Sequence, residues 1–297
     1  MANRIIFTVH VDIDEANLDN PGGFSLKTGE QFQTTKSLDT KNALNVWAGD
    51  LIKNQSQYAM KIGADYVVRQ NDKDYRDFHN MVAEQHPQIS EYDVINFYKH
   101  WLMSFYADRY DEVCYVDLDV VFNTEDNIFE AHDIHNKFAC RESNDEAEFG
   151  KKLPAPLYDR CIRNPASKYW NAFAMLLDSG LSRAEADTDV FNTGIMIASA
   201  DLVKKLDYFG NLNQVLEDME YLKTDTTIFH PNIVRSFNYD NETVFAYKRV
   251  VNSVDIEYIH QCWHYILQEG TVIDPDAKVY HVIHKRFEEL EHILCRS

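Results

Sequence analysis

The sequence has little of several features that place a chain in a special class. Glycine is scarce, with ten residues among 297, and there is no repeat of fixed period, no Gly/Ser-rich linker and no low-complexity tract. Hydrophobic residues make up 45% of the chain and aromatic residues 13%. This composition excludes a fibrous or disordered chain and predicts a globular protein with a sizeable core.

Cysteine is also sparse and irregularly spaced. The five cysteines are odd in number, lie far apart and include no Cys-x-x-Cys pair. This pattern is typical of unpaired thiols in a reducing compartment rather than of a disulfide framework or a zinc site. The N-terminal segment lacks the length and cleavage site of a signal peptide, and no apolar run approaches the roughly 18 residues of a membrane span. A cytoplasmic location without a membrane span is therefore expected.

Positive charge is in short supply. Lys and Arg total 29 against 48 Asp and Glu, which gives a formal net charge of −19. A chain this acidic is not expected to bind nucleic acid or an anionic membrane through its overall charge. It can still bind an anionic ligand through a few local cations or through a divalent metal ion.

What the first half of the chain does have is an alternation of strand-like and helix-like segments. Residues 4–11 are rich in Ile, Val, Phe and Thr and predict a buried strand. Apolar residues at helical spacing over 44–62 predict a helix that ends at Gly63, and residues 64–69 predict a second strand. Strand, helix and strand in this order predict a parallel βαβ unit. The polar residues 12–40 are expected to form a loop.

Capping signals and periodicity predict the remaining elements. A capping box at Ser90–Asp93 begins a helix that leads into a strand over 114–122. The further predicted segments are a helix over 166–177 opened by Asn164 and Pro165, a capping box at Ser182–Glu185, a strand over 191–199, a helix over 201–222, short strands with aromatic-rich loops over 226–268, a strand over 277–283 and a closing helix over 285–294. We expect an α/β fold with a mostly parallel sheet, a mixed α+β C-terminal half and no domain boundary.

Two acids, Asp117 and Asp119, interrupt the otherwise apolar strand "CYVDLDVVF". Side chains alternate along a strand, so both carboxylates are expected to point the same way, with Leu118 opposite. Converging carboxylates repel each other, and burying them without a partner is costly. Ligands of open α/β sheets bind at the carboxyl ends of strands, where Mg²⁺ or Mn²⁺ is the simplest partner for both acids. The alternative is that the acids cap a helix or pair with nearby Lys or Arg.

At these residues the sequence resembles a known family. "YKHWLMSFYADRYDEVCYVDLDVVF" (98–122), "FNTGIMIAS" (191–199) and "KVYHVIHK" (278–285) are similar to three blocks of the GT-A glycosyltransferases, especially the family-eight type related to glycogenin. The resemblance covers about residues 4–286 and implies a GT-A (Rossmann-like) fold. The activity it implies is sugar transfer from a nucleotide-diphosphate donor, with UDP favoured and stereochemistry retained, to a carbohydrate or glycoconjugate acceptor.

The resemblance also implies roles for individual residues in a single domain over 1–297. Asp117 and Asp119 would hold the metal, Mn²⁺ or Mg²⁺, with His281, which matches the family's position better, as a further ligand and His284 as the fallback candidate, and Asp117 would also contact the ribose. Residues implied near the nucleotide or donor are Thr8, Val9, His10 and Lys99, with Asn192 and Gly194 near the sugar. Lys285 is expected to add positive charge at the leaving diphosphate, whereas Asp187 and Asp189 either face the sugar or cap a strand. Residues 1–125 would form the nucleotide-binding half and 126–297 the half that completes the acceptor and metal sites.

Other classes of protein share some of these features. A haloacid-dehalogenase-type phosphatase carries a D-x-D motif on its first strand, followed by Thr or Gly-Thr, whereas here strands precede the motif and Val120-Val121 follows it. A nucleotidyltransferase carries a Gly-rich basic loop after its first strand, and "VDIDEANLDN" is not such a loop. A non-catalytic protein with a degenerate fold would bind a carbohydrate or nucleotide without turnover. The intact acids and late histidines favour the enzyme.

Overall fold

The computed structural model describes residues 2–18, 23–24, 31–32, 36–143, 160–161, 165–229, 231–234, 237–268 and 270–295. Its strands are β1 (Arg4–Val9), β2 (Gly23–Phe24), β3 (Gln31–Phe32), β4 (Asp65–Arg69), β5 (Glu112–Val116), β6 (Val120–Phe122), β7 (Phe138–Glu142), β8 (Arg160–Cys161), β9 (Phe191–Ser199), β10 (Ile256–Tyr258), β11 (Tyr265–Ile266) and β12 (Val279–His281). Its α-helices are α1 (Lys36–Lys61), α2 (Lys73–Gln85), α3 (Glu91–Ala107), α5 (Pro165–Asp178), α6 (Arg183–Ala186), α7 (Ala200–Leu206), α8 (Leu212–Leu222), α9 (Pro231–Val234), α10 (Asn241–Val251) and α11 (Glu291–Leu294). Short 3₁₀ helices are η1 (Glu15–Asn17), η3 (Gln261–Trp263) and η4 (Phe287–Leu290).

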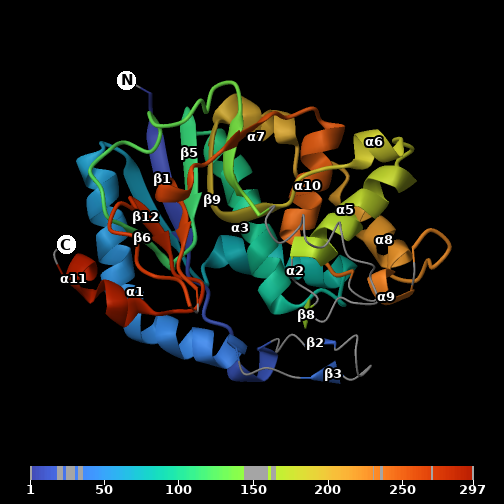
Figure 1. Cartoon of the computed structure of the whole chain (residues 1–297), viewed down its shortest axis with the longest axis horizontal. Helices are drawn as coiled ribbons and strands as arrows, with labels where there is room; N and C mark the ends of the chain where they lie inside the picture. Colours follow the sequence, from blue (N-terminus) through green and yellow to red (C-terminus); the bar gives the residue numbers. More distant parts are fainter. Residues whose placement is uncertain are drawn as a thin grey trace.

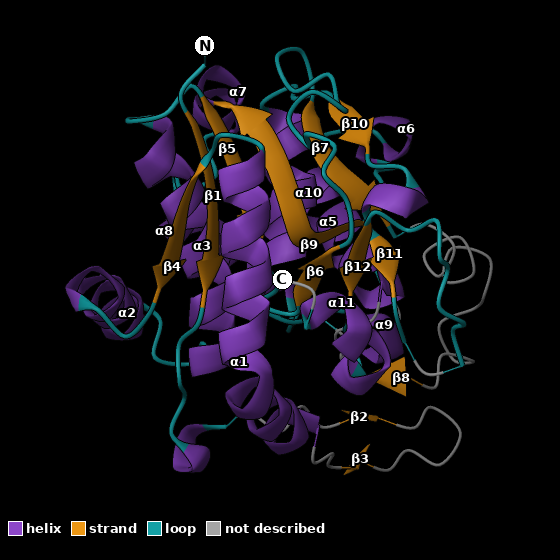
Figure 2. Cartoon of the chain, turned by 90° about the vertical axis from the view of Figure 1, so that its left-hand side faces the viewer, coloured by secondary structure: helices purple, strands orange, loops and turns teal. Residues whose placement is uncertain are grey.

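A six-stranded sheet forms the centre of the molecule, in the order β10-β7-β9-β5-β1-β4 (Figure 2). β4, β1 and β5 pair in parallel, and so do β7 and β10, whereas β9 runs antiparallel to both of its neighbours. The predicted parallel βαβ unit and the mostly parallel sheet flanked by helices are therefore confirmed. The reversal of β9 has a consequence for the site, because the start of β9 lies beside the end of β5.

Alternating residues of the central strands supply the two faces of this sheet. In β5, Val113 and Tyr115 belong to the core shared with α3, whereas Cys114 and Val116 pack on the other face, together with Tyr58 of α1. Figure 1 shows α1 on one side of the sheet and α3, α5 and α10 on the other. Among the described residues, no helix combines the length and hydropathy that a membrane crossing requires.

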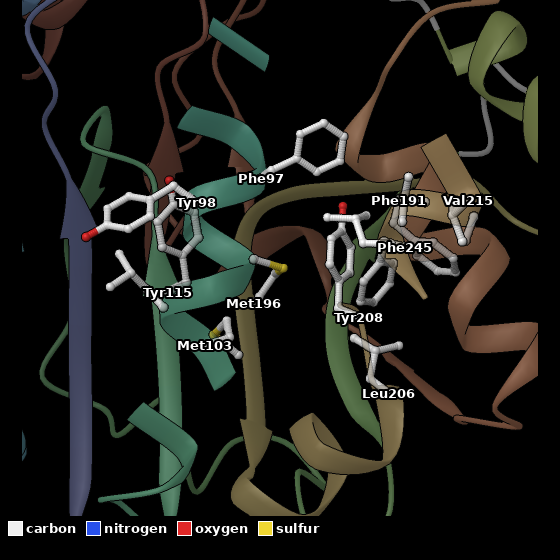
Figure 3. Close-up of a cluster of buried hydrophobic side chains, with 14 of the residues drawn as sticks. Phe97, Tyr98, Met103, Tyr115, Phe191, Met196, Leu206, Tyr208, Val215 and Phe245 are labelled. Atoms are coloured by element: carbon white, nitrogen blue, oxygen red, sulfur yellow. The ribbon is translucent and has the colours of Figure 1, made fainter. Parts of the chain in front are cut away.

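Large aromatic rings fill the space between the sheet and the helices on the α3 face (Figure 3). Phe191 at the start of β9 lies 5.4 Å, centroid to centroid, from Phe245 of α10, and Tyr208 stacks on His100 of α3 at 3.9 Å. Buried rings of this size contribute strongly to core stability. They fix α3 and α10 against the strand ends that carry the acids and the "FNTG" segment.

The predicted strand over 114–122 is wrong as a single element. The chain forms β5 and β6 there, and a turn at residues 117–119 separates them, because the backbone N–H of Val120 bonds the carbonyl of Asp117 at 3.1 Å. The predicted helix over 201–222 is likewise two helices, α7 and α8, since Asp207 and Asn211 adopt the left-handed conformation (φ 43° and 55°). Apolar residues lie on both sides of each break, so the apolar pattern alone does not reveal where the elements end.

Helices were also missed or misplaced. α2 was not predicted, α1 begins at Lys36 rather than near residue 44, and α10 occupies part of the segment predicted as strands and loops. The predicted closing helix is the short η4 followed by the single turn of α11. α10 escapes detection because its first residues, Asn241, Glu242 and Thr243, are polar yet buried. The predicted cap at Asn164 and much of the predicted loop over 12–40 lie outside the described residues.

Candidate functional site

A second, three-stranded sheet in the order β11-β12-β6 brings distant parts of the chain together at the end of β5. β6 pairs antiparallel with β12, and this register places His281 opposite Val120. The backbone N–H of Val282 then donates to the carbonyl of Asp119 at 2.9 Å. The late histidine therefore lies directly beside the two acids.

Three side chains converge at this point. Nε2 of His281 lies 3.4 Å from Oδ2 of Asp117 and 3.4 Å from Oδ1 of Asp119, and one ligand atom from each residue lies within 4.8 Å of the others. An octahedral ion with ligands at about 2.1 Å separates adjacent ligand atoms by about 3 Å, so these three atoms fit one shared cation. The two carboxylate oxygens suit a hard divalent cation such as Mn²⁺ or Mg²⁺, and an imidazole nitrogen is a common ligand of divalent transition metals. The group contains His281 and not the fallback candidate His284.

The two acids converge for a reason that differs from the predicted one. Asp117 and Asp119 do not alternate along a strand, because they lie in the turn between β5 and β6. Gln55 of α1 clamps this turn, with its Nε2 at 3.1, 3.2 and 2.9 Å from the carbonyl oxygens of residues 117, 118 and 120. The backbone N–H of Asp117 donates to the carbonyl of Gly194 at 2.7 Å. The turn is thus held from both sides.

Asn54 and Gln55 are site-supporting residues that the sequence analysis missed. The amide of Asn54 pairs with both backbone groups of Phe122, at 2.8 and 3.0 Å, as a neighbouring strand would. The hydroxyl of Tyr66 donates to Oε1 of Gln55 at 2.8 Å, and both amide side chains are buried. The available signal was a pair of adjacent amides inside the apolar stripe of α1, where an unpartnered polar group would be costly.

Two lysines neutralise the acids from opposite sides. Nζ of Lys285 pairs with Oδ2 of Asp119, and Nζ of Lys99 lies 3.7 Å from Oδ1 of Asp117 and 5.2 Å from the ring centroid of Tyr115. Burial opposes ionisation of the acids, but Lys99 for Asp117 and Lys285 for Asp119, each together with His281, hold both pKa values below the usual range. The acids are therefore ionised at neutral pH.

The imidazole of His281 responds to the same charges. Burial alone lowers its pKa, but the carboxylates, that of Asp119 foremost, outweigh burial and raise the pKa of His281 to about 9. Without a bound cation the imidazole is therefore protonated at neutral pH. Since a metal ligand needs the lone pair of Nε2, cation binding must release this proton.

This proton release predicts a pH-dependent Mn²⁺ affinity. Below the pKa of about 9 of His281, affinity is expected to rise up to about tenfold per pH unit, for example between pH 7 and pH 8. The metal-free protein should behave in the opposite way. Folding raises the pKa of His281, so the contribution of this imidazole to the free energy of unfolding is complete below about pH 6.5. That contribution is lost as pH rises through about 9.

Calorimetric titration with Mn²⁺ in buffers of different ionisation enthalpy measures the proton release directly. The matched control is His284→Gln, which should keep the pH dependence, whereas His281→Gln should lose both the slope and most of the affinity. Equal Mn²⁺ affinity of the wild-type protein at pH 7 and pH 8 would contradict the assignment of His281 as the titrating ligand.

Gly194, at the start of β9, lies against two of the three candidate metal ligands, His281 and Asp117. A Cβ atom at this position would lie 2.3 Å from Cε1 of His281 and 2.9 Å from Oδ2 of Asp117. Oδ1 of Asn192 accepts a hydrogen bond from the backbone N–H of Gly194 at 3.0 Å, which fixes the local backbone. The glycine is thus needed for close approach rather than for a special backbone angle.

Asp187 and Asp189 precede β9 and are each held by a tyrosine. Oδ1 of Asp187 accepts from the hydroxyl of Tyr169 at 2.9 Å, and Oδ2 of Asp189 accepts from that of Tyr258 at 2.6 Å. Nη2 of Arg249 also lies 3.7 Å from Oδ2 of Asp189. Neither carboxylate belongs to the three-residue metal group.

A pocket opens at the carboxyl ends of β1 and β4. It has a volume of about 360 Å³ and is lined by His10, Asp12, Gln70, Asn71 and Asp72. The amide of Asn71 binds the backbone N–H and carbonyl of Asp12 at 3.0 and 3.3 Å, which shapes the rim. Thr8 and Val9 are buried at the end of β1, and burial lowers the pKa of His10. β1, whose end leads into this pocket, pairs in parallel with β5, whose end leads into the turn with Asp117.

A buried polar network lies behind the "FNTG" segment and was also missed. Oε1 of Glu242 accepts from the backbone N–H and the hydroxyl of Thr193 at 2.8 and 3.2 Å, while Oε2 pairs with Lys168. Nδ2 of Asn241 donates to the same hydroxyl at 2.9 Å. These contacts hold Thr193, and with it the adjacent Asn192 and Gly194, in one position. Because the partners are far apart in sequence, no local sequence pattern predicts the network.

Comparison with known proteins finds similarity only among solved structures, since no family profile and no curated protein sequence matches the chain. A glycosyltransferase involved in the glycosylation of the major capsid of PBCV-1 is 11% identical at a TM-score of 0.46, covering 97% of this chain and 99% of that one. Mouse xyloside xylosyltransferase 1 is 12% identical at a TM-score of 0.45, covering 95% and 98%. The galactosyltransferase LgtC, in complex with donor and acceptor sugar analogues, is 11% identical at 0.41, covering 93% and 86%.

Proposed function

We propose that this chain is a metal-dependent glycosyltransferase that moves a sugar from a nucleotide-diphosphate donor, with UDP favoured, to a carbohydrate or glycoconjugate acceptor. The observation that carries the proposal is the convergence of Asp117, Asp119 and His281 within 4.8 Å at the carboxyl edge of the sheet. These three residues would hold Mn²⁺ or Mg²⁺. Ligands of open α/β sheets bind at this edge.

The pocket at the ends of β1 and β4 supports a nucleotide as part of the donor. β5, β1 and β4 are successive neighbours, and neighbouring strands lie about 4.8 Å apart, so the pocket lies within roughly 10 Å of the acids. A nucleoside spans a similar length between its base and its phosphates. The base would lie in the pocket near His10, above the buried Thr8 and Val9. The diphosphate would then reach the metal group, so that residues 1–125 bind the nucleotide and residues 126–297 complete the site.

The residues around the metal group suit the departure of a diphosphate. When bound, the divalent cation supplies Lewis-acid stabilisation of the leaving group. Lys285 would turn its ammonium group from Asp119 toward the diphosphate and add a second positive charge. Lys99 stays beside Asp117, where it keeps that carboxylate ionised.

The sugar would lie beside the start of β9. Asn192 and Gly194 lie there, since Oδ1 of Asn192 accepts from the backbone N–H of Gly194 and the carbonyl of Gly194 accepts from the backbone N–H of Asp117. We assign Asn192 to orienting the sugar, and Asp187 and Asp189 to the rim on which the acceptor approaches. We propose retention of stereochemistry from the resemblance to family-eight enzymes alone.

One contact favours a second candidate function. Lys285 already neutralises Asp119, so the site is electrostatically satisfied without a metal ion. A non-catalytic protein that binds a nucleotide or carbohydrate would need no more than this. The two candidates differ in their metal requirement and in turnover.

Thermal unfolding in the presence of UDP, GDP or CDP, each with and without Mn²⁺, tests the proposal. UDP at about 100 times its Kd is expected to stabilise the protein by about 2.7 kcal/mol, and only when Mn²⁺ is present. Incubation with a panel of nucleotide sugars should then release UDP. Stabilisation without release would favour the binding protein, and stabilisation by none of the three nucleotides would overturn the proposal.

A further inference from the structure

His264 contacts the imidazole of His281 on the side away from the acids. It lies between η3 and β11 and is fully buried. Its Nε2 lies 2.9 Å from Nδ1 of His281, and the two ring centroids are 5.1 Å apart. Nε2 of His281, on the opposite edge of the ring, faces Asp117 and Asp119. The metal-facing nitrogen and the His264-facing nitrogen are therefore different atoms of one ring.

The proton of a neutral imidazole can occupy only one of these two nitrogens. A metal ligand at Nε2 needs a lone pair there, so the proton must lie on Nδ1 and donate to an acceptor. Within the described residues, Nε2 of His264 lies at hydrogen-bond distance from this nitrogen. For that atom to accept, neutral His264 must carry its own proton on Nδ1, which is buried and has no partner among the described residues. We infer that His264 is a positioning residue for the metal site: it accepts the Nδ1 proton of His281 and thereby fixes the tautomer and orientation of that ligand. This inference rests on the metal site of the proposed function.

The surroundings restrict both rings to this arrangement. Arg141 donates to the backbone carbonyl of His264, which ties that residue to β7. The backbone N–H of Leu267 donates to the carbonyl of His281 at 2.9 Å, and β11 pairs in parallel with β12. The backbone of Gly194 closes the space around the His281 ring, since even a Cβ there would overlap Cε1. With its movement restricted, the ring depends on the hydrogen bond to select its proton position.

A simpler role for His264 is to fill space in the core, and paired variants separate the two roles. Glutamine can place an amide oxygen near the position of Nε2, so His264→Gln keeps the acceptor. His264→Leu fills the space without an acceptor, and His264→Asn stays polar but is too short to reach His281. Metal-site partners of this kind change metal affinity by about 10–100-fold when removed.

Mn²⁺ titration of the purified full-length chain, followed by the electron paramagnetic resonance signal of free Mn²⁺, measures the affinity. His264→Leu and His264→Asn are expected to weaken binding by about 10–100-fold, and His264→Gln by no more than about threefold. Thermal unfolding without metal accompanies each titration, and His264→Asn serves as the acceptor-free protein if His264→Leu does not fold.

The outcomes distinguish this inference from the function on which it rests. Wild-type affinity in His264→Leu or His264→Asn, or an equal loss in all three variants, would overturn the positioning role and leave the metal site intact. A wild-type protein that binds no Mn²⁺ in the first titration would instead overturn the metal site itself, and the positioning role with it.

Discussion

Asp119→Asn is expected to abolish Mn²⁺ binding and nucleotide-sugar turnover together. The substitution keeps the size of the side chain but removes one of the two carboxylate ligands and the charge that pairs with Lys285. A metal group reduced to Asp117 and His281 holds a hard cation poorly. Turnover should fall by a factor on the order of 10³, since stabilisation of the leaving group is lost.

Asp126→Asn is the matched control for this substitution. Asp126 follows the same segment and pairs with Lys278, but its side chain is 64% exposed and lies outside the metal group. Mn²⁺ titration and UDP release should be close to wild type in this variant. Substantial Mn²⁺-dependent turnover by Asp119→Asn would contradict both the metal site and the proposed mechanism.

Gly194→Ala is expected to disable the same site without touching a ligand atom. The added methyl group would lie 2.3 Å from Cε1 of His281, so either the imidazole or the start of β9 must move. β9 is held by Thr193 and its buried partners, so the imidazole is the part that gives way. Overpacking of this kind costs about 1–3 kcal/mol in the free energy of unfolding. Displacement of the ligand should weaken Mn²⁺ binding by about 100-fold.

Gly49→Ala provides a control that is expected to raise the free energy of unfolding, whereas Gly194→Ala is expected to lower it. Gly49 lies in α1, and a Cβ added there meets nothing within 4 Å. Alanine is favoured over glycine in a helix by about 0.5–1 kcal/mol, so this variant should be slightly more stable than wild type. Chemical denaturation and Mn²⁺ titration of both variants make the comparison. Wild-type Mn²⁺ affinity in Gly194→Ala would show that His281 does not need its present position.

The sequence predicted those elements of the fold whose apolar pattern is local and regular. β1, β4 and β9 are short runs of β-branched and aromatic residues, and α3 begins at Ser90, whose side chain accepts from the backbone N–H of Asp93 at 3.2 Å. α10 was missed because burial of its polar first turn depends on partners in α5 and β9. The break between β5 and β6 was missed because turn formation there depends on Gln55.

For the site, the sequence revealed which types of residue take part, but it did not reveal the strand pairing that brings them together. Asp117 and Asp119 stand out because ionised groups are rare within apolar runs. The choice between His281 and His284 needed the pairing of β12 with β6, which no local pattern encodes. The sequence analysis expected Gly194 beside the sugar, whereas its contact with His281 and Asp117 depends on the antiparallel course of β9. His264 gave no signal, because its partner lies in a strand that pairs with its own segment only after folding.

The candidate metal site can form only after β12 has been synthesised and has paired with β6. Asp119 and Lys285 are 166 residues apart, so Asp119 emerges from the ribosome long before the lysine that neutralises it, whereas Lys99, which neutralises Asp117, emerges earlier. A nascent chain that ends before β12 carries both carboxylates and Lys99, but neither the imidazole of His281 nor the ammonium group of Lys285. Closing so long a loop has an entropic cost, which is offset only when β12 pairs with β6. Metal loading should therefore be a post-translational event, and a prematurely terminated chain should be inert toward the cation.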